Sequence, residues 1–205
     1  MSGLNRERWN ALCRCAASIS SEWFERIAKL YSEPHRHYHN SRHILDCLSE
    51  FDSARHLAAD PLAVEMAIWF HDAVYDPRAS DNEERSADLA RKFVSETGEG
   101  DESAIVQLVL ATKNHDGSLH PDATLIVDVD LSIFGQPGER FWRYEEQIRR
   151  EYEWVPENVF REKRAEILEK FLSRPRIFGT EFFFSKYEAQ TRTNLQASIQ
   201  RLRDW

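Results

Sequence analysis

The stretch LAVEMAIWF, residues 62–70, is apolar except for Glu65, and it is followed directly by His71 and Asp72. A stretch of this length is too short to cross a membrane and is typical of a helix buried in a protein core. An unpaired charge in such surroundings costs several kcal/mol, which is comparable to the net stability of a domain. The His-Asp pair therefore needs a partner, and a bound cation would supply one.

Further metal-competent residues lie on both sides of this segment. His43 precedes it, and Asp128 and Asp130 follow it. With His71 and Asp72 they could form a mixed nitrogen and oxygen site. Residues two positions apart are rotated by about 200° around a helix. Asp128 and Asp130 therefore cannot both face one ion from the same helix.

Length and charge limit the possible functions. A chain of 205 residues is long enough for one domain with a substantial core, and we expect no second domain. The formal net charge is -8, which disfavours binding along the phosphate backbone of a nucleic acid. A small anionic substrate remains compatible with this charge if a cation sits in the pocket.

The cysteines and the N-terminus indicate the compartment. Cys13, Cys15 and Cys47 are odd in number and lack C-x-x-C spacing, so neither a disulfide framework nor a structural zinc knuckle is indicated. The first residues, MSGLNRERWN, contain no apolar core of a signal peptide, and no apolar run reaches the ~18 residues of a membrane span. We therefore expect an unprocessed cytoplasmic protein that does not bind membranes.

Helices dominate the expected secondary structure. Apolar residues recur at intervals of three and four through most of the chain, and only 7 residues are Gly, so we expect an all-α fold. Prolines and capping residues divide the pattern into helices. These are expected at 9–30, from about 40 to 51, at 61–71, from about 82 to 95, from 101 toward 115, and at 139–153, 157–172 and 180–202. Residues 122–135 are ambiguous, because LIVDVDLSIF is β-branched enough to form a strand.

The order His43, His71-Asp72, Asp130 resembles the H…HD…D signature of the HD-domain superfamily of metal-dependent phosphohydrolases, which is an all-α fold. Several blocks are similar to a bacterial subfamily described as predicted HD phosphohydrolases. They are RHYHNSRHI (36–44), WFHDAVYDP (69–77), DNEERSA (81–87), LATKNHDG (110–117) and DVDLSIFG (128–135). REYEWVPE, FLSRPRIF and TRTNL, nearer the C-terminus, extend the similarity over nearly the whole chain. The resemblance implies one phosphodiesterase-like helical bundle over residues 1–205, with a metal-binding core at about 36–135 and C-terminal helices 139–205 packed on it.

The resemblance also implies the metal ligands, namely His43, His71, Asp72 and Asp130. Asp130 is favoured over Asp128 because the superfamily's last ligand is usually followed by one residue and a leucine-like position. Asp128 would then contact the ligands without binding the ion. Two imidazoles and two carboxylates are suitable ligands for one divalent ion, which could be Mn, Fe, Co, Ni, Zn or Mg. An octahedral ion with these four ligands would have open positions for water and substrate. Such an ion makes bound water acidic and polarises a phosphoryl oxygen, so the chain needs no nucleophile of its own.

Five other residues are candidates for catalysis or substrate binding. Asp76 and Glu83 could orient the attacking water or protonate the leaving group, or they could be ordinary carboxylates near a helix start. His115 could contact the transferred phosphoryl group or be a surface histidine at a helix end. Arg36, beside the first ligand block, could bind phosphate through its guanidinium. His39 could contact the substrate, support a ligand, or belong to a solvated turn.

The sequence thus predicts a metal-dependent phosphohydrolase acting on a small phosphorylated metabolite, with a nucleotide or related phosphomonoester favoured. No G-x-S-x-G, H-E-x-x-H or Gly-rich phosphate loop competes with this interpretation. One alternative is a nucleotide- or metal-binding regulatory module without turnover. Another is a di-iron HD oxygenase, which needs two more histidine ligands between Asp72 and Asp130, where the chain offers only His115 and His120.

Overall fold

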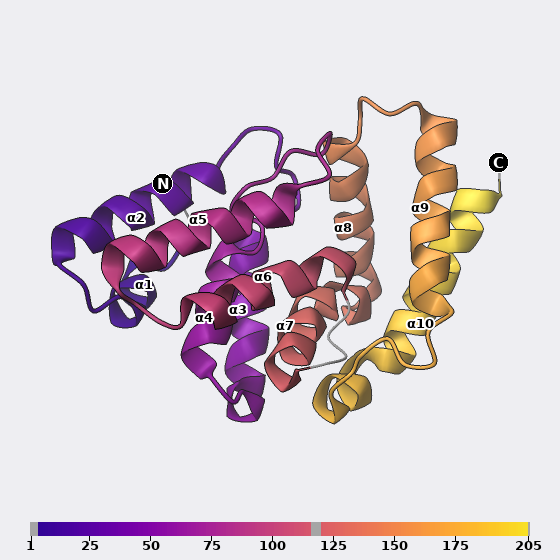
Figure 1. Cartoon of the computed structure of the whole chain (residues 1–205). Coiled ribbons are helices and arrows are strands. Elements are labelled where there is room, and N and C mark those ends of the chain that lie inside the picture. The colour runs from indigo at the N-terminus through magenta and orange to yellow at the C-terminus, as the bar shows by residue number, and fades with distance from the viewer. Residues whose placement is uncertain (1–3, 116–119, 205) are drawn as a thin grey trace. The chain divides into compact units, whose positions relative to one another are not determined.

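The computed structural model describes residues 4–115 and 120–204 (Figure 1). These residues form ten α-helices and two short 3₁₀-helices, and none of them lies in a strand, which confirms the all-α expectation. No helix in this part of the chain is long and apolar enough to pass through a membrane. The chain divides into two compact units, Met1–Val127 and Asp128–Trp205.

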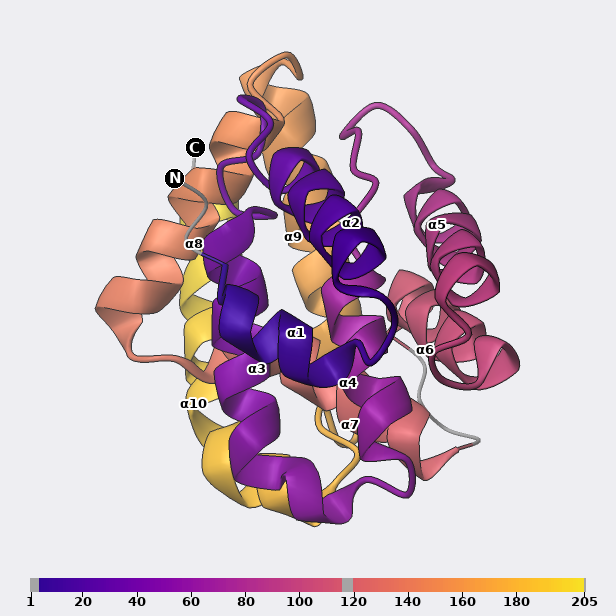
Figure 2. The same cartoon turned by 90° about the vertical axis from the view of Figure 1, so that its left-hand side faces the viewer.

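The first unit is built around a central helix. It contains α1 (Arg6–Leu12), α2 (Ala17–Leu30), α3 (Ser41–Ala54), η1 (Arg55–Leu57), α4 (Pro61–Phe70), α5 (Asn82–Thr97), α6 (Glu102–Asn114) and the start of α7 (Pro121–Leu131). Helix α4 packs against α3, α5 and α6 (Figures 1 and 2). Every residue from 63 to 70 is buried, which explains why this helix is apolar on all sides.

The single helix expected over residues 9–30 is in fact two helices. Helix α1 ends at Leu12, and Cys13 is extended, with φ −96° and ψ 113°. The indole Nε1 of Trp9 donates to the carbonyl oxygen of Ser20 at 3.0 Å, which ties α1 to α2. Apolar residues of both helices cover one core, so the periodicity continues across the break and does not reveal it.

Capping side chains fix the start of the helices that matter for the site. The Asn40 side chain accepts a hydrogen bond from a first-turn amide of α3, as expected from the sequence. Asp101 does the same for α6. Because Asn40 sets the start of α3, it also sets the position of His43, which lies in the first turn of that helix.

The ambiguous stretch at 122–135 is helical. Helix α7 runs to Leu131 and continues as the 3₁₀-helix η2 (Ser132–Gly135). Its β-branched residues Ile126, Val127 and Val129 are buried, so packing overrides their preference for strands. Helix α7 begins in the first unit and passes without interruption across the division at residues 127 and 128.

The second unit contains η2, α8 (Gly138–Glu151), α9 (Glu157–Leu172) and α10 (Glu181–Arg203). Helix α10 packs against α9 and η2. Asp128 is buried, and its carboxylate accepts hydrogen bonds from the backbone amides of Gly179 and Thr180 at 2.8 and 2.7 Å. The Thr180 hydroxyl adds a third at 2.6 Å. Asp128 therefore holds the start of α10 within this unit.

Candidate metal centre

Two helices of the first unit bring His43, His71 and Asp72 together. His43 lies in the first turn of α3, and His71 ends α4 with Asp72 next to it. The Nε2 atoms of the two histidines are 3.0 Å apart. Oδ2 of Asp72 lies 3.2 Å from Nε2 of His43 and 3.0 Å from Nε2 of His71. The three side chains are only 2%, 2% and 17% exposed, so these atoms form a nearly equilateral triangle shielded from solvent.

A backbone carbonyl decides which nitrogen of His71 carries the proton. Nδ1 of His71 lies 2.9 Å from the carbonyl oxygen of Ile68, so Nδ1 bears the hydrogen and donates it. In the neutral ring the lone pair is then on Nε2, which faces the carboxylate oxygen of Asp72. Two lone pairs at 3.0 Å repel each other unless a positive charge lies between them. That charge is either a proton on a histidine or a metal ion.

The electrostatics keep Asp72 ionised. Burial acts to raise the pKa of Asp72, but the positive charge of His71 and hydrogen bonds from His43 and His71 hold that pKa well below its ordinary value. The charge of His39 acts in the same direction. Asp72 is therefore a carboxylate at neutral pH, which is the form that binds metal.

The triangle is small enough for one ion to contact all three side chains. The separations of 3.0, 3.2 and 3.0 Å are also ordinary hydrogen-bond lengths, so they fit either a shared proton or one metal ion. Two imidazole nitrogens and one carboxylate oxygen suit a divalent cation and would leave positions open for further ligands.

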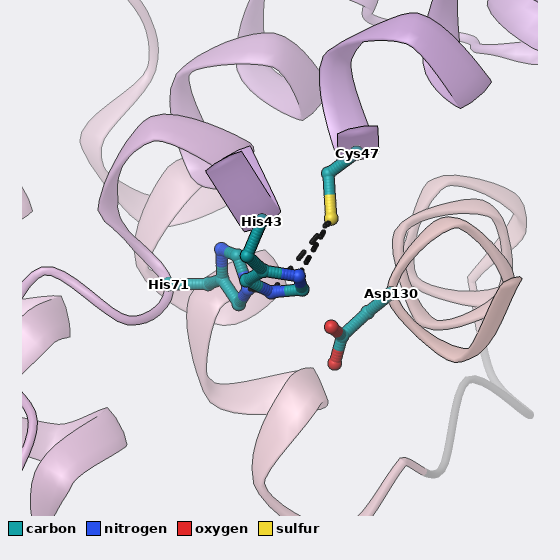
Figure 3. Close-up of side chains that lie close together, drawn as sticks. All are labelled: His43, Cys47, His71 and Asp130. Carbon is teal, nitrogen blue, oxygen red and sulfur yellow. Dashed lines mark hydrogen bonds between the residues drawn. The ribbon is translucent and has the colours of Figure 1, made fainter. Parts of the chain in front are cut away.

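A second group, which shares the two histidines with the triangle but does not include Asp72, could also hold a metal ion and is made of His43, Cys47, His71 and Asp130 (Figure 3). Cys47 is buried one turn along α3 from His43. Its Sγ lies 3.7 Å from Nδ1 and 3.8 Å from Nε2 of the His43 ring. Because the sulfur is nearly equidistant from both ring nitrogens, it does not lie along the direction of the Nε2 lone pair. Asp72 therefore fits the role of ligand better than Cys47 does.

Cys47 belongs to this group although the number and C-x-x-C spacing of the cysteines do not predict it. The available signal was the i, i+4 spacing of His43 and Cys47, which places both side chains on one face of a helix.

Asp130 lies in the last turn of α7 and is half-buried. The carboxylate of Asp128, two residues earlier, binds Gly179 and Thr180 instead. The two aspartates on α7 thus have different surroundings, as the rotation of about 200° between them requires. The supporting role beside the metal ligands that the resemblance implied for Asp128 is replaced by this structural role.

Arg36 does not have the surroundings of a substrate-binding residue. Its side chain is 0% exposed. Its guanidinium donates to the backbone carbonyls of His39, Asp72 and Ala73 and pairs with Glu33. A group enclosed in this way cannot reach a phosphate in solution, so the structure does not support the substrate contact expected of Arg36.

His39 lies close to the proposed ligands. Its ring stacks on Tyr75 with centroids 4.2 Å apart, and its centroid is 5.9 Å from that of His43. Its charge also acts on Asp72. The substrate contact predicted for His39 stays a prediction.

The predicted acid and base residues lie on three elements. Asp76 is exposed, and its Oδ1 accepts from the amide of Arg78 in the turn before α5. Glu83 is half-buried in the first turn of α5. His115 ends α6 in the left-handed conformation, with φ 48°. Residues 116 and 117 of the LATKNHDG block lie outside the described residues, and the catalytic roles of Asp76, Glu83 and His115 stay predictions.

No family model, curated protein or solved structure matches this chain. The resemblance to the HD-domain superfamily therefore rests on the sequence blocks alone. The structure adds a helical fold with a His–Cys–His–Asp group that could bind a metal ion.

Proposed function

We propose that the protein is a metal-dependent phosphohydrolase of the HD type that acts on a small phosphorylated metabolite, most favourably a nucleotide or related phosphomonoester. The observation that supports it best is the buried triangle of His43, His71 and Asp72, whose facing atoms need a positive charge among them, which a metal ion or a proton can supply. Asp130 is proposed as the fourth ligand. A divalent cation bound there would activate water and polarise a phosphoryl oxygen.

The chain's own residues would prepare the site for this chemistry. The carbonyl of Ile68 keeps His71 in the tautomer that presents Nε2 to the site. The surroundings of Asp72 keep it ionised. The mixed nitrogen and oxygen donors suit one divalent ion, which could be Mn, Fe, Co, Ni, Zn or Mg.

Substrate contacts and proton transfer would come from residues around the triangle. His39, stacked on Tyr75 next to His43, is proposed to contact the phosphoryl group. Asp76, Glu83 and His115 remain the candidates for proton transfer and for phosphoryl contact.

Two other functions share the same metal site. A regulatory module would bind metal and nucleotide without turnover. A di-iron oxygenase would need two additional histidine ligands. His120, one of the two candidates, accepts a hydrogen bond from the Asp122 amide at 3.2 Å at the start of α7. That contact favours a structural role for His120 and makes the oxygenase the weaker alternative.

Activity is tested by offering the full chain nucleotides, sugar phosphates and cyclic dinucleotides, with Mn²⁺, Co²⁺, Mg²⁺ or Zn²⁺ in separate reactions. We expect release of phosphate or nucleotide with at least one metal, and loss of that release in Asp72→Ala with an unchanged helical circular dichroism spectrum. Removing a metal ligand deletes both the activated water and the polarisation of the substrate.

Asp46→Ala is the matched control, because Asp46 is a surface carboxylate on α3 that pairs with Arg42. It should retain activity. Metal binding without release of any product would favour the regulatory module, and full activity in folded Asp72→Ala would exclude the proposed mechanism.

A further inference from the structure

Arg36 connects the two backbone segments that carry the proposed ligands. Its Nη1 donates to the carbonyl of His39 at 3.1 Å and to that of Asp72 at 2.6 Å, and its Nη2 donates to the carbonyl of Ala73 at 2.9 Å. His39 directly precedes the residue that caps α3, the helix of His43. Asp72 and Ala73 follow the end of α4. One planar group thus holds the start of one ligand-bearing helix against the end of the other.

Arginine has the chemistry that this position requires. The carbonyls of His39, Asp72 and Ala73 lie outside the helices and have no intrahelical donors, so a buried cation with several donors satisfies them. A guanidinium offers five N–H donors in a fixed plane, whereas the lysine ammonium is a compact point charge on a flexible chain. An arginine can therefore bridge carbonyls of two segments at a defined spacing.

The surroundings of Arg36 restrict it to one position. Its guanidinium carbon lies 5.1 Å from the ring centroid of Tyr31 and 5.5 Å from that of Tyr75. Its Nε lies 3.0 Å from a carboxylate oxygen of Glu33. A cation fixed by two aromatic rings and one carboxylate has little freedom to move, so the spacing that it imposes on the two segments is well defined.

We propose that Arg36 is a positioning residue of the metal centre. It sets the distance between the turn that carries His71 and Asp72 and the helix start that carries His43. This inference rests on the proposed metal site and gives that site a determinant that touches neither metal nor substrate. Loss of the bridge lets the two segments move apart, and the 3.0–3.2 Å triangle of ligand atoms loosens. Changes to residues that orient metal ligands lower metal affinity by about 10- to 100-fold.

Co²⁺ is a suitable probe, because its visible absorption reports the number and geometry of its ligands. Arg36→Lys keeps the charge but removes the planar donor set. We expect it to weaken Co²⁺ binding to the full chain by about 10- to 100-fold and to alter the absorption bands of the bound ion.

Arg192→Lys is the matched control. Arg192 donates to the carbonyls of Leu172, Arg174 and Pro175 within the second unit, so it makes the same kind of contact on segments without proposed ligands. Both variants should melt at a lower temperature, but Arg192→Lys should bind Co²⁺ as the wild type does. Equal weakening in both variants, or wild-type affinity in Arg36→Lys, would overturn the proposal.

Two further outcomes are distinguishable. A wild-type chain that binds no Co²⁺ refutes the metal site itself, whatever the role of Arg36. If Arg36→Lys does not fold, Glu33→Gln removes the carboxylate that orients the guanidinium and leaves the donor set in place. We expect Glu33→Gln to lower Co²⁺ affinity by a smaller factor, and unchanged affinity in that variant would contradict the positioning role.

Discussion

A single carbonyl at the end of α4 decides what His71 can do. Helix ends leave carbonyls without intrahelical donors, and the carbonyl of Ile68 accepts from Nδ1 of His71 at 2.9 Å. The same contact fixes the ring's orientation and leaves Nε2 for the site. The helix end thereby sets both the position and the tautomer of His71, which is the proposed metal ligand.

The cysteines of the first unit should differ in reactivity. Burial, with the charges of Cys15 and Glu99, raises the pKa of Cys13 from 9.0 to about 12. Burial also raises the pKa of Cys15, but that side chain is half-exposed. Because the thiolate is the reactive form, iodoacetamide at about pH 8 should label Cys15 at least about tenfold faster than Cys13, as measured by peptide mass spectrometry.

The same shift has a consequence for stability. The folded pKa of Cys13 lies above its ordinary value of 9.0, so the stability linked to this thiol is fully present below about pH 9 and is lost as the pH rises toward 12. Equal labelling rates for Cys13 and Cys15 in the folded protein would show that burial does not protect Cys13.

Residue identity predicted three residues that the structure brings together. His43, His71 and Asp72 could be chosen because their residue types bind metal and because an apolar helix leads into two of them. The role of Arg36 could not be predicted, since the sequence shows a cation beside the ligand block but not which groups it faces. The partners of Arg36 are backbone carbonyls. Every residue has a backbone carbonyl, so the sequence does not indicate which ones Arg36 contacts.

The contact between η2 and α10 depends on a glycine. A Cβ added to Gly135 would lie 2.5 Å from Cβ of Tyr187 and 2.6 Å from its Cδ1. The Cβ of Tyr187 is fixed to its backbone, so the two elements would have to separate. We expect Gly135→Ala to lower the free energy of unfolding by about 1–3 kcal/mol in urea denaturation.

Gly138→Ala provides the control for this substitution. A Cβ at Gly138 would meet nothing within 4 Å, and the residue lies in the first turn of α8. Alanine there should leave the stability unchanged or raise it by up to about 1 kcal/mol. Similar losses in both variants would show that the contact with Tyr187 does not determine the effect.

Helix boundaries were predictable where a side chain marks them. Asn40 and Asp101 cap their helices as the sequence indicated, because these side chains replace a missing backbone partner. The break after Leu12 and the helical state of 122–135 were not predictable. In both places packing decides the conformation, through the bond from Trp9 to Ser20 and through the burial of the α7 side chains.

At the scale of the whole molecule, the chain has two compact units where its length suggested one domain. The division falls within α7, a continuous helix, and no Gly- or Ser-rich linker marks it. Composition and length cannot reveal such a division, because it depends on which helices pack together. The expectation of a single HD-type domain stays a prediction.

Metal binding would also stabilise the folded chain. An ion that binds only the folded state stabilises it by about 2.7 kcal/mol when its concentration is 100 times its dissociation constant. The triangle exists only when α3 and α4 are packed together, so the unfolded chain has no equivalent site.

The central claim is tested most directly by the metal content of the protein after equilibrium dialysis against Mn²⁺, measured by elemental analysis. We expect about one ion per chain in the wild type and in Cys47→Ser, and almost none in folded His71→Ala, because the site loses one of its two imidazole nitrogens. A wild-type chain without bound Mn²⁺, or His71→Ala with the wild-type content, would contradict the account.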